Sequence, residues 1–141
     1  MKNCKKSLLS VLMLAAATLV AVPAFAAPKY SFKLAHVITA GTPIDVGAKK
    51  FAEMVSQRTK GEVEIKVFPA GQLGGERAII EGVQLGTIEM SFTTTGAIAG
   101  FAPEFQVLDL PFLFPSYEAA YTYLDGEQGK KLLALLDRKG I

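Results

Sequence analysis

Between residues 30 and 93, segments in which every second residue is apolar alternate with segments in which apolar residues recur every three or four positions. The first pattern is that of a strand and the second that of a helix. Residues 63–67 place apolar and charged side chains at alternate positions, which is the pattern of a strand. Residues 43–59 repeat apolar side chains at spacings of three and four, which predicts a helix that Pro43 opens. The predicted elements are strands over 30–37, 63–67 and 88–93 and helices over 43–59 and 76–85. This βαβαβ order predicts an α/β fold with a mainly parallel sheet flanked by helices.

Shorter elements follow the last predicted strand. Residues 94–100 are small and rich in hydroxyl groups, which suits a turn that begins a short helix. The apolar run 107–114 contains Pro111, which would interrupt any strand pairing there. Ser116 is a good N-cap for a helix over 117–124.

The end of the chain has the pattern of an unfinished unit. A final helix is expected near 128–139, followed by Gly140 as a stop and Ile141 as the first residue of a strand. We therefore expect residues 27–141 to be a truncated α/β unit. A complete small domain with a ragged end is the alternative.

Residues 1–26 have the three zones of an export signal. Three lysines and no acid precede an apolar run of about 15 residues, and small residues then suit cleavage between Ala26 and Ala27. A retained anchor is the alternative, but the run is shorter than the roughly 20 residues that span a bilayer. We expect a periplasmic protein that does not itself span the membrane after processing. Cys4 leaves with the leader, so the mature chain can form no disulfide.

The net charge of the chain depends on this leader. The formal charge of +2 includes the three leader lysines, and without them 12 Lys and Arg residues face 13 Asp and Glu residues. The basic pairs Lys49–Lys50 and Lys130–Lys131 suit solvated helix faces. No nucleic-acid partner is therefore expected.

Few residues of the chain suit catalysis. His36 is the only histidine and the mature chain has no cysteine, which excludes Cys–His pairs and His-based metal sites. The glycine-rich run 71–75 has neither the Gly-Lys-Ser/Thr of a nucleotide loop nor a G-x-G-x-x-G motif. Glu62 and Glu64 share the solvent face of their strand. We predict no catalytic residue, no metal and no cofactor.

Polar residues gather where the predicted strands end. His36 ends the first strand, Glu76 opens the helix after the second, and Thr93, Thr94 and Thr95 follow the third. Ligands of open α/β sheets bind beyond the carboxyl ends of the strands, so these residues predict a half-pocket for a small hydroxylated or acidic solute. Each also suits a local role: His36 bonded at a strand end, Glu76 favouring the helix dipole, and the threonines forming a turn.

Two motifs accompany these strand ends: Phe-Pro-Ala-Gly-Gln-Leu-Gly at 68–74 and Leu-Pro-Phe at 110–112. Several shorter segments accompany these two motifs from about Tyr30 to the end of the chain, and the order and spacing of all of them can be compared with those of known families. The chain resembles in these segments the DctP-type solute receptors of TRAP (tripartite ATP-independent periplasmic) transporters. The matching segments are 34–37, 51–53, 59–76, 86–90 and 108–114.

The resemblance implies that residues 27–141 are the truncated N-terminal α/β lobe of a periplasmic-binding-protein-like receptor whose second lobe is missing here. It also implies that such a two-lobed receptor closes on a small organic acid and delivers it to TRAP membrane permease subunits. It implies that His36, Glu76 and residues 93–95 face the cleft, and that an arginine of the second half clamps the ligand carboxylate. Arg77 is not that arginine, because it follows the glycine loop of the first lobe. This chain alone is then expected not to bind. A receptor of another uptake system and a periplasmic enzyme remain alternatives.

The resemblance leaves the ligand open. Some relatives carry an acidic residue at or near the position of Thr94, and this chain departs from that subtype. Ligands of that subtype, including sialic acid, are therefore not implied.

Overall fold

The computed structural model describes residues 27–141, which form a three-layer α/β unit followed by a group of short helices. The sheet has three parallel strands in the order β2-β1-β3, with β1 over Tyr30–Ala35, β2 over Val63–Phe68 and β3 over Met90–Ser91. Helix α2 (Pro43–Arg58) connects β1 to β2, and helix α3 (Glu76–Gln84) connects β2 to β3. The predicted α/β class and parallel sheet are confirmed. The predicted leader, with Ala26 of the predicted cleavage site, lies outside the described residues.

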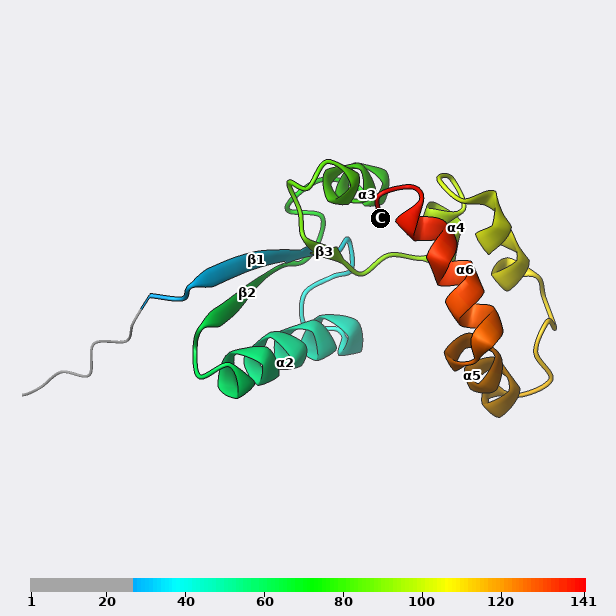
Figure 1. Ribbon diagram of the computed structural model, residues 1–141, viewed down its shortest axis with the longest axis horizontal. Coiled ribbons are helices and arrows are strands. Elements are labelled where there is room, and N and C mark those ends of the chain that lie inside the picture. Colours follow the sequence, from blue (N-terminus) through cyan, green and yellow to red (C-terminus); the bar gives the residue numbers. More distant parts are fainter. Residues whose placement is uncertain (1–26) are drawn as a thin grey trace, which may run out of the picture.

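The two crossover helices cover opposite faces of the sheet, as Figure 1 shows. Successive residues of a strand point to opposite faces, and Leu34 and Ala35 of β1 are both buried. Leu34 packs with Ala48 of α2, whereas Ala35 packs with Ile79 of α3. The near-continuous apolar character of the end of β1 follows from burial on both sides.

Strand β3 is shorter than the predicted strand over 88–93. It pairs with β1 through Leu34–Met90 and Ala35–Ser91 only. On one side, the N–H of Ile88 donates to the carbonyl oxygen of Gly82 at 3.1 Å and so completes the turn that ends α3. On the other side, the N–H of Thr94 donates to the side chain of Glu76. The N–H of Phe92 still donates to the carbonyl oxygen of Ala35 in β1 at 3.1 Å. Pairing ends there, because the N–H groups of Ile88 and Thr94 are committed outside the sheet.

The second part of the molecule consists of helices only. It comprises α4 (Thr95–Ile98), the 3-10 helix η1 (Pro103–Asp109), α5 (Tyr117–Asp125) and α6 (Glu127–Asp137). Ser116 caps α5 as predicted, because its hydroxyl oxygen accepts a hydrogen bond from the N–H of Ala119 at 3.2 Å. The predicted apolar run 107–114 begins inside η1 and continues as turns around Pro111.

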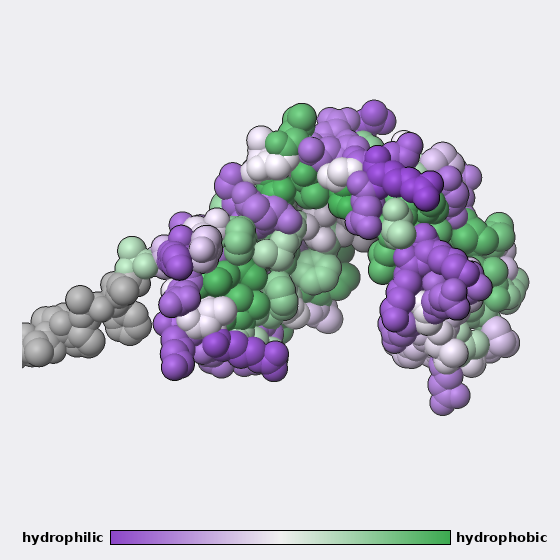
Figure 2. Space-filling model, in the orientation of Figure 1, coloured by the Kyte–Doolittle hydropathy of each residue, from purple (hydrophilic) through white to green (hydrophobic). Residues whose placement is uncertain are grey.

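Adjacent residues of α3 join the two parts. Ile79 packs on the sheet side with Ala35 and Ile88, whereas Ile80 packs with Ile98 and Phe105 of the helical part. Helix α6 returns toward α3 (Figure 1), where the amide of Gln84 donates to the carbonyl oxygen of Lys139 at 2.7 Å. The two parts form an arch, and Figure 2 shows the hollow between α2 and the α5–α6 pair.

Candidate functional site

The carboxylate of Glu76 lies at the point where the sheet passes into the helical part. Its Oε1 accepts a hydrogen bond from the hydroxyl of Thr93 at 2.9 Å and from the backbone N–H of Thr94 at 2.6 Å. Glu76 is the first residue of α3, and residues 92–94 leave β3 at the same edge of the sheet. The sequence expectation that these three residues gather at the strand ends agrees with this geometry.

Local chain geometry brings Glu76 to this position. The N-cap of α3 is Gly75, which has no side chain to cap the free N–H groups of the first turn. A carboxylate at the first helical residue is favoured by the helix dipole. Partial burial raises the pKa of the Glu76 carboxyl, but the hydrogen bonds from the N–H of Thr94 and the hydroxyl of Thr93 outweigh it and hold that pKa below its usual value.

A cavity of about 310 Å³ opens beside this carboxylate. Its walls are mostly apolar, with Glu76 as the one charged residue and two threonines as the other polar groups; the lining residues are Ile38, Ile44, Gly47, Glu76, Phe92, Thr93 and Thr94. Small-molecule sites commonly combine apolar walls with a few fixed polar groups, and the volume lies at the lower end of their range. One wall comes from the β1–α2 connection and the start of α2, and the other from the end of β3.

Thr94 and Thr95 have different surroundings although they are neighbours in sequence. The Thr94 hydroxyl oxygen accepts a hydrogen bond from the N–H of Ala97 and caps α4. The Thr95 hydroxyl donates to Oδ1 of Asp109 in η1. Thr93 and Thr94 therefore belong to the group around Glu76, whereas Thr95 ties α4 to η1 and is not among the lining residues.

His36 ends β1 as predicted, but it is fully buried and lies behind the cavity wall. Its ring stands edge-on to Phe92, with 6.4 Å between the ring centroids, and Phe92 lines the cavity. Its Nε2 lies 3.5 Å from Oδ1 of Asp45, and neither ring nitrogen makes a hydrogen bond with the described residues. Direct contact between His36 and a ligand stays a prediction.

Asp45 is the residue near this site that sequence reasoning missed. It is fully buried in the first turn of α2, and its Oδ2 accepts from the N–H of Gly41 and from Nζ of Lys49, both at 2.7 Å. The hydrogen bond from Gly41, then that from Lys49, lowers the pKa of the Asp45 carboxyl despite burial. An acidic residue two positions after the helix-opening Pro43, with a lysine four positions on, was the available signal.

The sequence profile of the DctP family, described as "Bacterial extracellular solute-binding protein, family 7", matches residues 34–141. The chain belongs to this family. It is a family of solute-binding proteins rather than enzymes, as predicted, and the predicted resemblance to TRAP receptors is confirmed.

Several DctP-family proteins resemble this chain closely. The C4-dicarboxylate-binding periplasmic protein DctP of Rhodobacter capsulatus is 40% identical over 124 residues, which cover 85% of this chain and 36% of that protein. The sugar acid binding protein DctPAm from Advenella mimigardefordensis, solved with galactonate, is 37% identical to this chain and superposes on it with a TM-score of 0.75. The match covers 80% of this chain and 36% of that protein. A TRAP solute-binding protein from Sulfurospirillum deleyianum, solved with succinate, is 35% identical with a TM-score of 0.74 and covers 79% of this chain and 36% of its own.

This DctP-family chain thus spans little more than a third of the length of these relatives. The family relatives include periplasmic binding proteins. Within residues 27–141, no helix combines the length and apolarity that crossing a bilayer requires. In the same residues, no group of three His, Cys, Asp or Glu side chains is placed to hold a metal ion.

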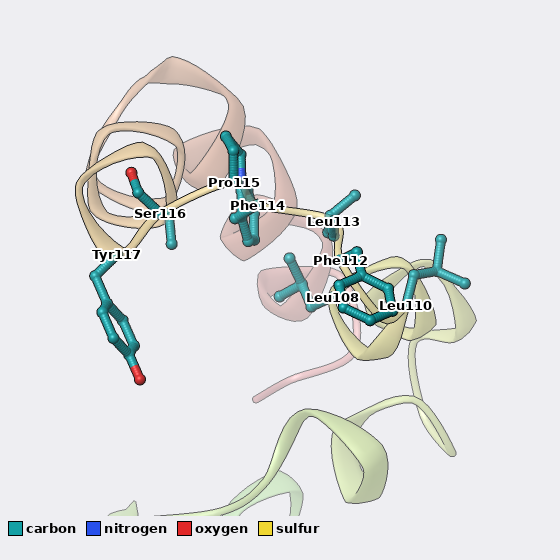
Figure 3. Close-up of a pocket in the computed structure, with 9 residues that line it drawn as sticks. Leu108, Leu110, Phe112, Leu113, Phe114, Pro115, Ser116 and Tyr117 are labelled. Atoms are coloured by element: carbon teal, nitrogen blue, oxygen red, sulfur yellow. The ribbon is translucent and has the colours of Figure 1, made fainter.

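A second pocket in this DctP-family chain lies between η1 and α5 and has a volume of about 570 Å³. Figure 3 shows Leu108, Leu110 and Phe112 grouped at the end of η1, apart from Ser116 and Tyr117 at the start of α5. Its lining residues carry no charged side chain, and the Ser116 hydroxyl already caps α5. The cavity beside Glu76 therefore suits a polar solute better than this pocket does.

Proposed function

We propose that residues 27–141 form the N-terminal lobe of a periplasmic TRAP receptor that binds a small organic acid and delivers it to membrane permease subunits. The observation that carries the proposal is the Glu76 carboxylate, held by Thr93 and Thr94 beside a cavity at the strand ends. Relatives support the ligand class: two are solved with galactonate and succinate, and a third with D-erythronate. Residues 1–26 are the export signal in this proposal, removed between Ala26 and Ala27.

The polar groups of the cavity favour the hydroxyl end of such a solute. A carboxylate only accepts hydrogen bonds, so Glu76 pairs with ligand hydroxyl or amino groups and repels a ligand carboxylate placed next to it. The Thr93 hydroxyl gives its proton to Glu76, so toward a ligand it can only accept. The Thr94 hydroxyl accepts from the N–H of Ala97 and keeps its proton to donate. A hydroxy acid would therefore direct its hydroxyl groups toward Glu76 and its carboxylate away from it.

The ligand carboxylate needs a cation from elsewhere. The residues that line the cavity include no lysine and no arginine. A second lobe that supplies an arginine opposite Glu76 would complete the site, because the guanidinium fork matches a planar carboxylate. His36 and Thr95 contribute in this proposal from the rim or the wall, since neither lines the cavity of this lobe.

Calorimetric titration tests the proposal. Galactonate, D-erythronate and succinate are titrated into the complete receptor that carries this chain and, separately, into residues 27–141. We expect the complete receptor to bind at least one of them and residues 27–141 to show no heat, because one lobe covers only one side of the solute. Micromolar binding by residues 27–141 alone would contradict the two-lobed site.

Transport distinguishes the proposed system from other uptake systems. In proteoliposomes that hold TRAP permease subunits, the receptor should support uptake of its solute under an ion gradient without ATP. Uptake that needs ATP hydrolysis would reject the TRAP assignment and leave solute binding intact.

A further inference from the structure

A buried carboxylate stands directly behind the cavity wall. Asp45 is fully buried, yet residues on both sides of it in sequence, Ile44 and Gly47, line the cavity. A buried charge is costly unless it is paired and hydrogen-bonded. Asp45 meets this condition through the N–H of Gly41 and the ammonium group of Lys49, and it also stands in the first turn of α2, where the helix dipole favours an anion.

The other oxygen of Asp45 constrains the imidazole of His36. Oδ1 of Asp45 and Nε2 of His36 lie 3.5 Å apart, and both side chains are fully buried. An ionised carboxylate can only accept, so the ring nitrogen that faces it must carry a proton. We therefore expect the carboxylate to favour a proton on Nε2 of His36, because the partner of one ring nitrogen sets which nitrogen is protonated.

These contacts fix the loop that forms one wall. Gly41 is in the left-handed region, with φ of +84°, in the connection from β1 to α2, and Asp45 holds it from inside. The same connection is held at its start by two backbone hydrogen bonds. The carbonyl oxygen of His36 accepts from the N–H of Gly71, and that of Ile38 accepts from the N–H of Ala70. Ile38, which is held by its own carbonyl oxygen and lies three residues before Gly41, lines the cavity. His36 also packs against Phe92 of the opposite wall.

We propose that Asp45 is a positioning residue of the solute site. It acts through Gly41 and His36 to hold Ile38 and Phe92 in place, and it does not touch the solute itself. The inference rests on the proposed function, because it concerns the affinity of the cavity beside Glu76 for a solute.

Nitrogen NMR of the 141-residue chain tests the contact between Asp45 and His36. His36 is the only histidine, so its ring signals are unambiguous. In the unaltered chain we expect the ring proton on Nε2. In Asp45→Asn the amide oxygen must stay with Gly41 and Lys49, so its NH₂ group faces His36 and the proton moves to Nδ1. Glu53→Gln removes an exposed carboxylate of the same helix, paired only with Lys50 and Gln57, and should leave the Nε2 form unchanged. An unchanged tautomer in Asp45→Asn overturns the proposal.

Solute binding to the complete receptor, with galactonate, D-erythronate and succinate as probes, tests the consequence. We expect Asp45→Asn to weaken binding at least about tenfold, since one charge-assisted hydrogen bond corresponds to about that factor, and Glu53→Gln to stay within about twofold. If Asp45→Asn also stays within twofold, the positioning role is rejected and the proposed function stands. If the unaltered receptor binds none of the probes, the proposed function fails and this inference fails with it.

A second variant covers the case in which Asp45→Asn does not fold. Gly41→Ala disfavours the left-handed backbone of the residue that Asp45 anchors, adds a Cβ that meets no atom within 4 Å, and leaves the buried carboxylate and its contact with His36 in place. Weaker solute binding with an unchanged His36 tautomer would support the positioning role. Unchanged binding would overturn it.

Discussion

The carboxylate of Glu76 accepts a hydrogen bond of 2.6 Å from the backbone N–H of Thr94, eighteen residues further along the chain. This contact joins the first residue of α3 to the connection between β3 and α4. The side chain best placed to meet a solute therefore also fixes the segment that links the sheet to the helical part. Substitution of Glu76 can separate its role in solute binding from its role in fixing this link.

Glu76→Gln should weaken solute binding more than it weakens the fold. The amide oxygen can still accept from Thr94, so we expect the free energy of unfolding to fall by at most about 1 kcal/mol. Loss of the charge should lower the affinity of the complete receptor for a hydroxy acid roughly tenfold, or about 1.4 kcal/mol. Thermal unfolding and calorimetry measure the two effects, with Glu81→Gln on the exposed face of α3 as the control. A loss of stability with unchanged affinity would make Glu76 a structural residue only.

The stability of the fold should depend on pH through Asp45 and Glu76. Both carboxyl groups have pKa values lowered in the folded chain, so each stabilises the fold above its unfolded pKa and loses that effect as the pH falls through its folded pKa. We expect their contribution to be constant from pH 7 to about 5 and to decline below the ordinary values of 4.5 for Glu and 3.8 for Asp. Urea unfolding at several pH values measures this contribution to the free energy of unfolding. In the double variant Asp45→Asn, Glu76→Gln, the free energy of unfolding should fall less on acidification. An equal fall in the variant and in the unaltered chain would contradict this account.

Gly47→Ala should stabilise the fold and narrow the cavity. Gly47 lies within α2, and a Cβ there meets no atom within 4 Å, so alanine should add about 0.5–1 kcal/mol to the free energy of unfolding. Because Gly47 lines the cavity, the new methyl group takes up space there, so the affinity of the complete receptor for galactonate, the largest of the three probes, should fall. Gly82→Ala is the contrast in α3, because its Cβ would stand 2.8 Å from Cδ1 of the buried Ile88. A Gly82→Ala chain more stable than the unaltered chain would reject the packing described for this position.

Ile79→Ala and Ile80→Ala should loosen different parts of the molecule. Each removes a fully buried side chain and should cost about 2–5 kcal/mol. Ile79 packs with the sheet and Ile80 with the helical part, so amide hydrogen exchange should accelerate mainly in β1 and β3 for the first and in α4 and η1 for the second. Leu85→Ala, at an exposed position, should change stability by less than about 0.5 kcal/mol. The same exchange pattern in both isoleucine variants would show that the two cores are one cooperative unit.

Export of the full 141-residue chain should yield a product that begins at Ala27. The cleavage follows from the small residues at Ala24 and Ala26 after the apolar run. Intact-mass measurement of the periplasmic product decides the point, and Ala26→Arg should block processing. An unprocessed chain in the membrane fraction would instead favour a retained anchor.

Local sequence was enough to predict the order and type of the main elements. The period-two pattern of 63–67 and the helical spacing of 43–59 correspond to β2 and α2, and Ser116 caps α5 as expected. These features depend on contacts within a few residues, because side-chain periodicity and capping are properties of a single element. The family was also readable from the motifs at 68–74 and 110–112, since residues 34–141 match its profile.

The sequence by itself thus determined the α/β order, the family and the strand ends at which polar groups gather. Only the tertiary structure decided which of these groups meet. Glu76 reaches Thr93 and Thr94, whereas Thr95 turns to Asp109, and His36 is buried against Asp45. The reason is physical: the partner of a side chain depends on how elements far apart in sequence pack, and an interior position excludes water only once its neighbours have been assembled around it.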